Sequence, residues 1–343
     1  MTDRGKAMPC VFRRVMKKLL IDTDIGIDCD DAMAIGAAIA LEKKGLIHIE
    51  GISTCTAREG ASGCVSAITD YYGLSKPTAS YFGTPLECDK RNIYAKDVRD
   101  AFRKKDSGEE SVRFLRKKLA SSEDGVILVS LGPMTVIAAL LESMPDDISL
   151  WSGRELVARK AEALYAMGGN FVAYEDRYKG RYAYGAEWNI CQDIPAAQFV
   201  VENIPVPVIF SPYETGVRVL SGESFGEGSP VKMSIRLFFE RNRDEFEEKF
   251  ARASWDPITV CMAAGADWFS LSSPGRIAVD DEGKTLFFAG KGNHRYLIEK
   301  NPPEQTAEKL DELYAELEKN VRSSEAGRKP EKNLFVSKMA DAE

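Results

Sequence analysis

Histidine is scarce in this chain, with His48 and His294 the only two among 343 residues. Imidazole is the commonest acid–base group and metal ligand near neutral pH, so chemistries that need several histidines are excluded. The seven cysteines are odd in number and show no metal-type spacing, which predicts reduced thiols in the cytoplasm. No apolar run is long enough to span a membrane, and residues 1–18 lack the apolar core of a secretory signal. We therefore expect a cytoplasmic protein with no membrane partner.

An excess of positive charge is also missing, because the formal net charge is −7. That balance argues against a surface for nucleic acid or anionic lipid. A hydrophobic content of 44% and a charged content of 29% are ordinary for a globular enzyme. Without an internal repeat or a low-complexity linker, the sequence predicts one domain over residues 17–322, with a flexible tail at 1–16 and a disordered tail at 323–343.

Apolar runs alternate with helical patterns along most of the chain. The expected strands are 19–22, 47–53, 125–130, 163–167 and 206–210. Helices are expected at 31–42, 57–72 and 233–249, among others, and a hairpin is expected at 275–288 with its turn at 281–283. Such repeats predict an α/β fold with a mostly parallel central sheet and helices on both of its faces. Ligands bind at the carboxyl ends of the strands in sheets of this kind. Leu131 and Asn170 each follow an expected strand end, so both are expected at that rim.

The most informative stretch is the acidic loop after the first strand. Its five carboxylates fall within ten positions, at Asp22, Asp24, Asp28, Asp30 and Asp31. Like charges so close repel one another strongly, and a bound cation with oxygen ligands would relieve the repulsion. Helix capping and a solvated turn would explain two such carboxylates, but they explain five poorly. The loop therefore predicts a site for a divalent cation.

This stretch resembles the N-terminal signature of the nucleoside hydrolases, the inosine–uridine-preferring family. The commoner form is Asp-x-Asp-x-Gly-x-Asp-Asp-Ala, and Asp28-Cys29 are two extra residues here. Three further segments match family motifs in the same order: Val129–Thr135 is similar to a strand followed by Gly-Pro-Leu-Thr, Gly185–Asn189 to Ala-Glu-Phe-Asn, and Ser254–Pro257 to His-Asp-Pro. The resemblance spans roughly residues 19–315.

The resemblance implies a role for each matching residue. Asp24, Asp31, Asp256 and the main-chain carbonyl of Leu131 would bind Ca²⁺, and Asp24 would act as the general base toward a water molecule. Asp22 would support the loop from behind. Substrate would be bound by the remaining candidates, namely Asp30 at the 2′-hydroxyl, Glu187 and Asn189 at the ribose, Asn170, and Trp255 as a stacking surface. The implied activity is Ca²⁺-dependent hydrolysis of the N-glycosidic bond of a ribonucleoside or related ribosyl compound, by a homodimer or homotetramer.

Trp255 stands where the family commonly has histidine, and neither His48 nor His294 falls in a matching motif. Indole cannot protonate a leaving base at neutral pH, although it can stack on one. This departure leaves open a calcium-dependent ribosyl-binding protein without catalysis. From the residues alone, Trp255 is equally well explained by core packing, and Asp256 by a helix cap before Pro257.

A third hypothesis assigns the chain to a different class of enzyme. Asp22-Thr23-Asp24 after a strand also resembles the Mg²⁺-dependent haloacid dehalogenase phosphatases. That family has Thr or Val two residues after its second Asp, and Gly26 occupies this position here. We expect no phosphatase activity.

Overall fold

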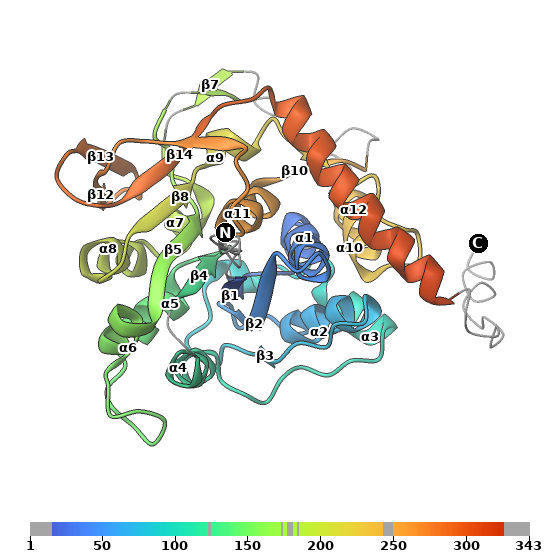
Figure 1. Ribbon diagram of the computed structural model, residues 1–343, viewed down its shortest axis with the longest axis horizontal. Coiled ribbons are helices and arrows are strands. Elements are labelled where there is room, and N and C mark those ends of the chain that lie inside the picture. Colours follow the sequence, from blue (N-terminus) through green and yellow to red (C-terminus); the bar gives the residue numbers. More distant parts are fainter. Residues whose placement is uncertain are drawn as a thin grey trace, which may run out of the picture.

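The structure is a computed structural model. It describes residues 16–122, 125–172, 174–176, 181–183, 185–242 and 250–325. Its centre is an eight-stranded sheet in the order β11-β14-β8-β5-β4-β1-β2-β3 (Figure 1). Every neighbouring pair in this sheet is parallel except β11 and β14 at one edge. The expected α/β fold with a mostly parallel sheet is therefore confirmed.

The strands of the sheet and of three small two-stranded ribbons have the following bounds: β1 Lys17–Thr23, β2 Ile47–Thr54, β3 Thr78–Ala79, β4 Val126–Ser130, β5 Ala161–Met167, β6 Tyr174–Asp176, β7 Arg181–Ala183, β8 Val208–Ser211, β9 Leu220–Ser221, β10 Arg252–Ala253, β11 Phe269–Leu271, β12 Gly275–Val279, β13 Thr285–Ala289 and β14 Arg295–Glu299. The helices are α1 Asp30–Lys43, α2 Ala61–Tyr71, α3 Ala95–Ala101, α4 Ser111–Ser121, α5 Thr135–Glu142, α6 Gly153–Lys160, α7 Trp188–Gln192, α8 Ile194–Asn203, α9 Tyr213–Gly216, α10 Pro230–Arg241, α11 Trp255–Ala263 and α12 Pro303–Glu325, with a 3₁₀ turn at Glu87–Lys90.

Helices cover both faces of the sheet because β1 is apolar on both sides. Leu19 and Ile21 belong to a core shared with α1, α2, α11 and α12, whereas Leu20 points into a second core shared with α4, α5 and α8. Alternate residues of a strand face opposite sides of the sheet, so a continuous apolar run buries both. The two cores fix the position of β1, and β1 delivers the acidic loop to its carboxyl end.

Most expected elements are present with shifted ends. The expected strand at 19–22 is β1, and the helix expected after the acidic loop is α1. The helix expected from Ala57 begins only at Ala61, because Gly60 before it has a φ of +84° that ends the preceding loop. Helix α12 continues to Glu325, past the expected domain end at 322.

Most residues of the two tails expected at 1–16 and 323–343 are not among those that the structure describes. Residues 1–15 and 326–343 are outside the described residues, as are 243–249 of a helix expected to reach Lys249. Within the described part of the chain, no helix is both long and apolar enough to cross a membrane.

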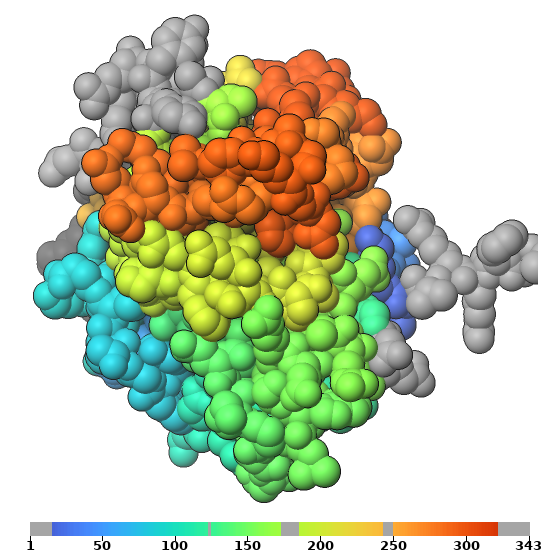
Figure 2. Space-filling model, turned by 90° about the vertical axis from the view of Figure 1, so that its left-hand side faces the viewer, coloured from blue at the N-terminus to red at the C-terminus, as the bar shows by residue number. Residues whose placement is uncertain are grey.

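The second core continues to an outer ribbon. The expected hairpin at 275–288 is the antiparallel pair β12–β13, with its turn at 281–283. Figure 2 shows this hairpin side by side with α8 on one face of the molecule, where the side chain of Gln198 donates to the carbonyl of Val279 at 3.3 Å. Thr285 of the hairpin in turn bonds Asn170, so the ribbon supports the loop after β5.

Candidate functional site

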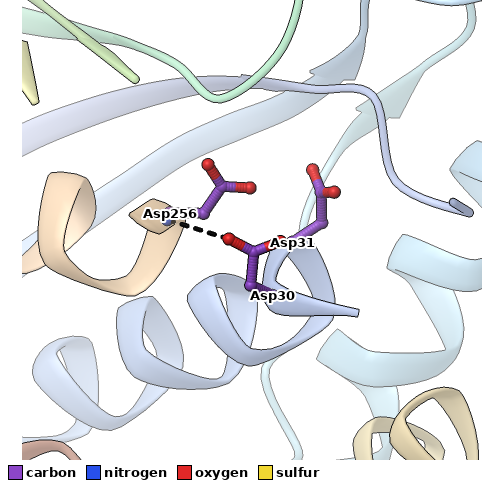
Figure 3. A group of neighbouring side chains, drawn as sticks. All are labelled: Asp30, Asp31 and Asp256. Atoms are coloured by element: carbon purple, nitrogen blue, oxygen red, sulfur yellow. Dashed lines mark hydrogen bonds between the residues drawn. The ribbon is translucent and has the colours of Figure 1, made fainter. Parts of the chain in front are cut away.

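Two helices begin at the same place beyond the carboxyl edge of the sheet. Asp30 and Asp31 form the first turn of α1, and Asp256 lies in the first turn of α11 (Figure 3). One carboxylate oxygen from each lies within 4.8 Å of the others, and the main-chain N–H of Asp256 donates to Oδ2 of Asp30 at 3.2 Å. Residues 226 positions apart thus form one acidic cluster, which we call the Asp30–Asp31–Asp256 cluster.

The cluster is buried, with exposed fractions of only 3–4% for its members. Burial raises the pKa of each of the three carboxyls well above its ordinary value, and the neighbouring carboxylates raise it further. The amino-terminal ends of α1 and α11 offset part of this repulsion, because helix dipoles place positive potential there. Three buried carboxyls remain close together, and a bound cation is the direct way to stabilise their ionised form.

Asp24 and Asp22 flank the cluster from the end of β1. Burial raises the pKa of Asp24 to about 6, although the nearby Arg58 lowers it. Burial raises the pKa of Asp22 to about 7, and the hydroxyl of Ser53 donates to its Oδ1 at 2.6 Å. The main-chain carbonyl of Asp22 accepts the N–H of Leu131 at 2.8 Å, so Asp22 ties β1 to the loop after β4.

Two close approaches fix the acidic loop. Gly26 has a φ of +127°, and a Cβ there would meet the side chains of Arg58 and Ala95 at 2.7 and 2.8 Å. A Cβ at Gly132 would lie 2.7 Å from the side chain of Asp24. Glycine has no Cβ, so Gly26 leaves room for the tight acidic loop and Gly132 leaves room for the side chain of Asp24 beside the loop after β4.

Arg58 is a buried cation that no sequence motif singles out. Its guanidinium donates to the main-chain carbonyls of Asp24 and Ile25 from one side, and to those of Cys88 and Arg91 from the other. It thereby fastens the acidic loop to the segment before α3 and supplies positive charge beside Asp24. Hydrogen bonds from a charged donor to a carbonyl are stronger than neutral ones, so this attachment is firm.

The loop after β4 meets the residues expected to hold ribose. The amide of Asn189 donates to the main-chain carbonyl of Leu131 at 3.1 Å and to that of Met167 at 3.4 Å. Glu187 caps α7 by accepting the N–H groups of Asn189 and Ile190, and it accepts that of Gly169 as well. Burial raises the pKa of Glu187 to about 7, and the proximity of Asp24 contributes to the rise. Both expected residues therefore lie at the carboxyl edge.

Asn170 and Trp255 are also buried near this edge, but in different settings. The side chain of Asn170 donates to the carbonyl of Gly185 at 2.7 Å, while its own Oδ1 has no partner. The indole N–H of Trp255 donates to the carbonyl of Tyr213 at 2.8 Å, and the indole ring packs against Tyr213 and the guanidinium of Arg252. Asn170 thus offers a free acceptor, whereas the contacts of Trp255 favour core packing.

Buried polar atoms without a partner gather at the same edge. Among the described residues, four of them lie in or just after the carboxyl-terminal ends of β1, β5 and β8: Asp22 Oδ2, Asn170 Oδ1, Ser211 Oγ and Glu214 Oε2. Buried polar groups in native proteins are nearly always paired, so such a concentration indicates groups that a ligand or water completes. We infer that the carboxyl edge of β1, β5 and β8 is a binding site.

Glu214 is a further residue that the sequence did not single out. It lies in α9, and its Oε1 accepts the N–H groups of Phe171 and Val172. Burial raises the pKa of Glu214 to about 7, so it can hold a proton near neutral pH. No motif marks a lone glutamate after a proline, and only the fold places it next to Asn170.

Both histidines lie near the amino-terminal ends of strands, on the side of the sheet opposite the carboxyl ends that carry the acidic cluster. His48 is near the start of β2 and pairs with Glu42 at 3.2 Å. His294 precedes β14, where its ring accepts the N–H of Val208 and meets the carbonyl of Val201. Both imidazoles therefore lie near the amino ends of strands, away from the Asp30–Asp31–Asp256 cluster.

The side chains present fit a hard divalent cation. Within the described residues, the Asp30–Asp31–Asp256 cluster is the set of His, Cys, Asp and Glu side chains close enough to share an ion. Its donors are all carboxylate oxygens, which Ca²⁺ and Mg²⁺ prefer over thiol or imidazole ligands. Asp24 is close enough to raise the pKa of Asp31 by its charge, although it is outside that set.

Comparison with known proteins gives matches of two kinds. The pyrimidine-specific ribonucleoside hydrolase RihA of Escherichia coli is 27% identical over 183 residues, covering 51% of this chain and 53% of RihA. The chain thus matches about half the length of these curated relatives. Two solved structures share the fold, each with a TM-score of 0.62: an inosine-uridine preferring nucleoside hydrolase from Bacillus anthracis (17% identity, 89% of this chain and 100% of that one) and a purine-preferring ribonucleoside hydrolase from Gardnerella vaginalis (18% identity, 90% and 100%).

The family itself is shown by a match along most of the sequence. A model described as inosine-uridine preferring nucleoside hydrolase matches residues 19–314, a range that contains most of β1, the acidic cluster and α11. The expected resemblance over roughly 19–315 is confirmed. This match favours the nucleoside hydrolase hypothesis over that of a haloacid dehalogenase phosphatase. This chain belongs to the inosine-uridine preferring nucleoside hydrolase family.

Proposed function

We propose that this protein hydrolyses the N-glycosidic bond of a ribonucleoside or a related N-ribosyl compound, with Ca²⁺ as its cofactor. The observation that carries the proposal is the buried Asp30–Asp31–Asp256 cluster at the carboxyl edge of the sheet. Family membership supports the reaction class, and the specificities in the names of RihA and of the two solved relatives support nucleosides as substrates. Those relatives differ in base preference, so the base acted on here stays open.

In this proposal the acidic residues divide between metal and sugar. Asp31, Asp256, Asp24 and the carbonyl of Leu131 hold the ion, and a carbonyl that accepts one bond from Asn189 still has a second lone pair for it. Bound Ca²⁺ would supply positive charge that favours ionised carboxylates, bound sugar hydroxyls and a more acidic water. Asp24 would accept a proton from the attacking water, and its pKa of about 6 leaves most of this carboxyl ionised at neutral pH.

The pentose is held by the groups around this centre. Asp30 accepts from the 2′-hydroxyl, and Glu187, Asn189 and Asn170 bind the remainder of the ribose. The negative charge of the site favours the oxocarbenium-like sugar as the C1′–N bond breaks. Trp255 is proposed as an apolar wall of the base site, with its indole N–H occupied by Tyr213.

A second function, ribosyl binding without hydrolysis, is favoured by one observation. Neither histidine of the chain lies at the carboxyl edge, so no imidazole is available there to protonate a departing base. The family relationship favours the enzyme over this alternative. Both functions use the same cation site, so metal binding alone does not separate them.

An assay of base release from uridine, inosine and cytidine, monitored by chromatography, distinguishes the enzyme from the binding protein. We expect turnover with added Ca²⁺ and its loss after chelation, with recovery when Ca²⁺ is restored. Calorimetry on the same preparation would measure nucleoside binding. Tight binding with no base released over long incubation would instead establish the binding protein, and absence of both would overturn the proposal.

We further propose that the active protein is cytoplasmic and a homodimer or homotetramer. The rationale is the reduced state expected of the cysteines, six of which are free in the described residues, and the assembly common among relatives of this fold. Light scattering of the purified protein would give the mass of the assembly, and a monomeric mass would contradict the second statement.

A further inference from the structure

Asp28 and Cys29 are the two residues that interrupt the family's acidic motif, and Asp28 forms an ion pair with Arg252 that the proposed chemistry does not use. Asp28 accepts from Nε of Arg252 at 2.8 Å and also from Nη2, so the contact is a two-pronged one. The side chain of Arg252 is only 9% exposed and that of Asp28 is 29% exposed. A pair of this geometry and burial holds its partners more firmly than a surface pair.

The pair joins the two segments that supply the acidic cluster. Asp28 is two positions before Asp30, and Arg252 is four positions before Asp256. Apart from it, the direct bond described between these segments is the single one from the N–H of Asp256 to Asp30. The carboxylates on the two sides repel one another, so an attachment between the segments must oppose that repulsion.

Both ends of the pair are themselves fixed. The guanidinium of Arg252 lies 4.8 Å from the ring centre of Phe238 and 5.1 Å from that of Trp255. The main-chain carbonyl of Asp28 accepts the hydroxyl of Tyr94 at 2.7 Å, and its Oδ1 accepts the N–H of Cys29 at 2.8 Å. Neither residue can move without disturbing α10, α11 or the start of α3.

We propose that the Asp28–Arg252 pair is a brace that holds the acidic loop and the first turn of α11 at the separation needed to bind the metal ion and the pentose. Asp28 and Arg252 are positioning residues, because they act through Asp30, Asp31 and Asp256 rather than on substrate. The proposal rests on the function proposed above. It also gives the two extra residues a purpose, since the longer loop lets Asp28 reach Arg252.

A brace and a simple change of charge predict opposite results for one variant. If only charge mattered, Arg252→Gln would strengthen Ca²⁺ binding by removing a cation, and Asp28→Asn would weaken it. A brace requires that both substitutions weaken binding. We expect each to raise the Kd for Ca²⁺ roughly 10- to 100-fold, as outer-shell changes at metal sites do. We also expect the double variant to lose little more than either single one, because both remove the same contact.

The chain offers a matched control in the pair Arg116–Asp146. That pair has bonds of 3.0 and 2.8 Å and side-chain exposures of 2% and 25%, and Arg116 belongs to α4, a helix of the second core. Asp146→Asn should lower thermal stability and leave Ca²⁺ affinity unchanged. The activity of Asp28→Asn should recover at saturating Ca²⁺, which a general folding defect would not allow.

Calorimetric titration of the full chain with CaCl₂ tests the brace separately from the function. If the wild-type protein binds no Ca²⁺, the proposed function fails. If the wild type binds while Arg252→Gln binds as tightly or more tightly, the brace is overturned and the function stands. Equal weakening in Asp146→Asn would also overturn the brace.

Discussion

Asp24→Asn should abolish base release and at the same time make the metal-free protein more stable. Loss of the proposed general base alone costs roughly 10²- to 10⁴-fold in rate, and loss of a metal ligand adds to this. The amide avoids the burial of a carboxyl whose pKa is raised to about 6, so the free energy of unfolding rises. A loss of activity combined with a gain in stability is the result expected where the active site itself is destabilised.

The measurements are nucleoside turnover, Ca²⁺ titration and thermal unfolding in the presence of a chelator. Asp146→Asn is again the control, because it should lose stability and keep activity. If Asp24→Asn retained turnover near the wild-type rate, the assignment of Asp24 as base and ligand would be wrong. If it destabilised the metal-free protein, the electrostatic account of the loop would be wrong.

The stability of the metal-free protein should fall as pH rises from about 4 to about 7, contrary to the behaviour of carboxyls in salt bridges. The pKa of Asp22 is raised to about 7 and that of Asp24 to about 6, so the folded chain keeps protons that the unfolded chain releases near pH 4. Stability is therefore fully present below pH 4 for these groups and is lost as pH rises through their folded pKa values. For Asp24 alone the loss is on the order of 3 kcal/mol.

Calcium should reverse this trend, because it binds the ionised carboxylates and competes with protons. Urea unfolding between pH 4.5 and 8, with chelator or with Ca²⁺, would show two curves that separate as pH rises. The Asp24→Asn variant should show a shallower fall in the chelated series. A metal-free protein whose stability rises steadily over this range would contradict the burial of uncompensated carboxyls.

The sequence predicted the framework of the site because the signals there are local. The apolar run before Asp22 specifies β1, and the small-residue helical pattern after Asp31 specifies α1. The order of apolar runs predicts a parallel sheet, and parallel strands bring their carboxyl ends to one edge. Only the family resemblance predicted that Asp256 lies beside the acidic loop, because the residues around Asp256 have the local pattern of a helix cap.

The residues that the sequence did not reveal act across long separations. Arg58 bonds carbonyls from two different loops, and Arg252 reaches Asp28 across 224 positions. An arginine that binds main-chain carbonyls leaves no motif, because the partners can be any residue. The antiparallel edge formed by β11 and β14 was missed for a related reason, since half-exposed short strands carry a weak apolar pattern.

The choice of Trp255 as a base-stacking residue stays a prediction. Its indole is 6% exposed and bonded to Tyr213, and a Cβ at Gly216 would touch the indole. Glu214 is the buried acid that the fold adds near Asn170, and its raised pKa suits a group that carries a proton. Neither residue could be weighed from spacing alone.

The central claim is that the buried carboxylates at the edge of the sheet exist to hold one divalent ion. Calorimetric titration of chelator-treated wild-type protein with CaCl₂ at pH 6.0, in two buffers of different protonation enthalpy, tests it directly. The account predicts about one ion bound per chain with net release of protons, because a pKa of about 6 leaves the Asp24 ligand partly protonated at that pH when the metal is absent. A titration with no heat of binding up to millimolar Ca²⁺, or binding without proton release, would contradict it.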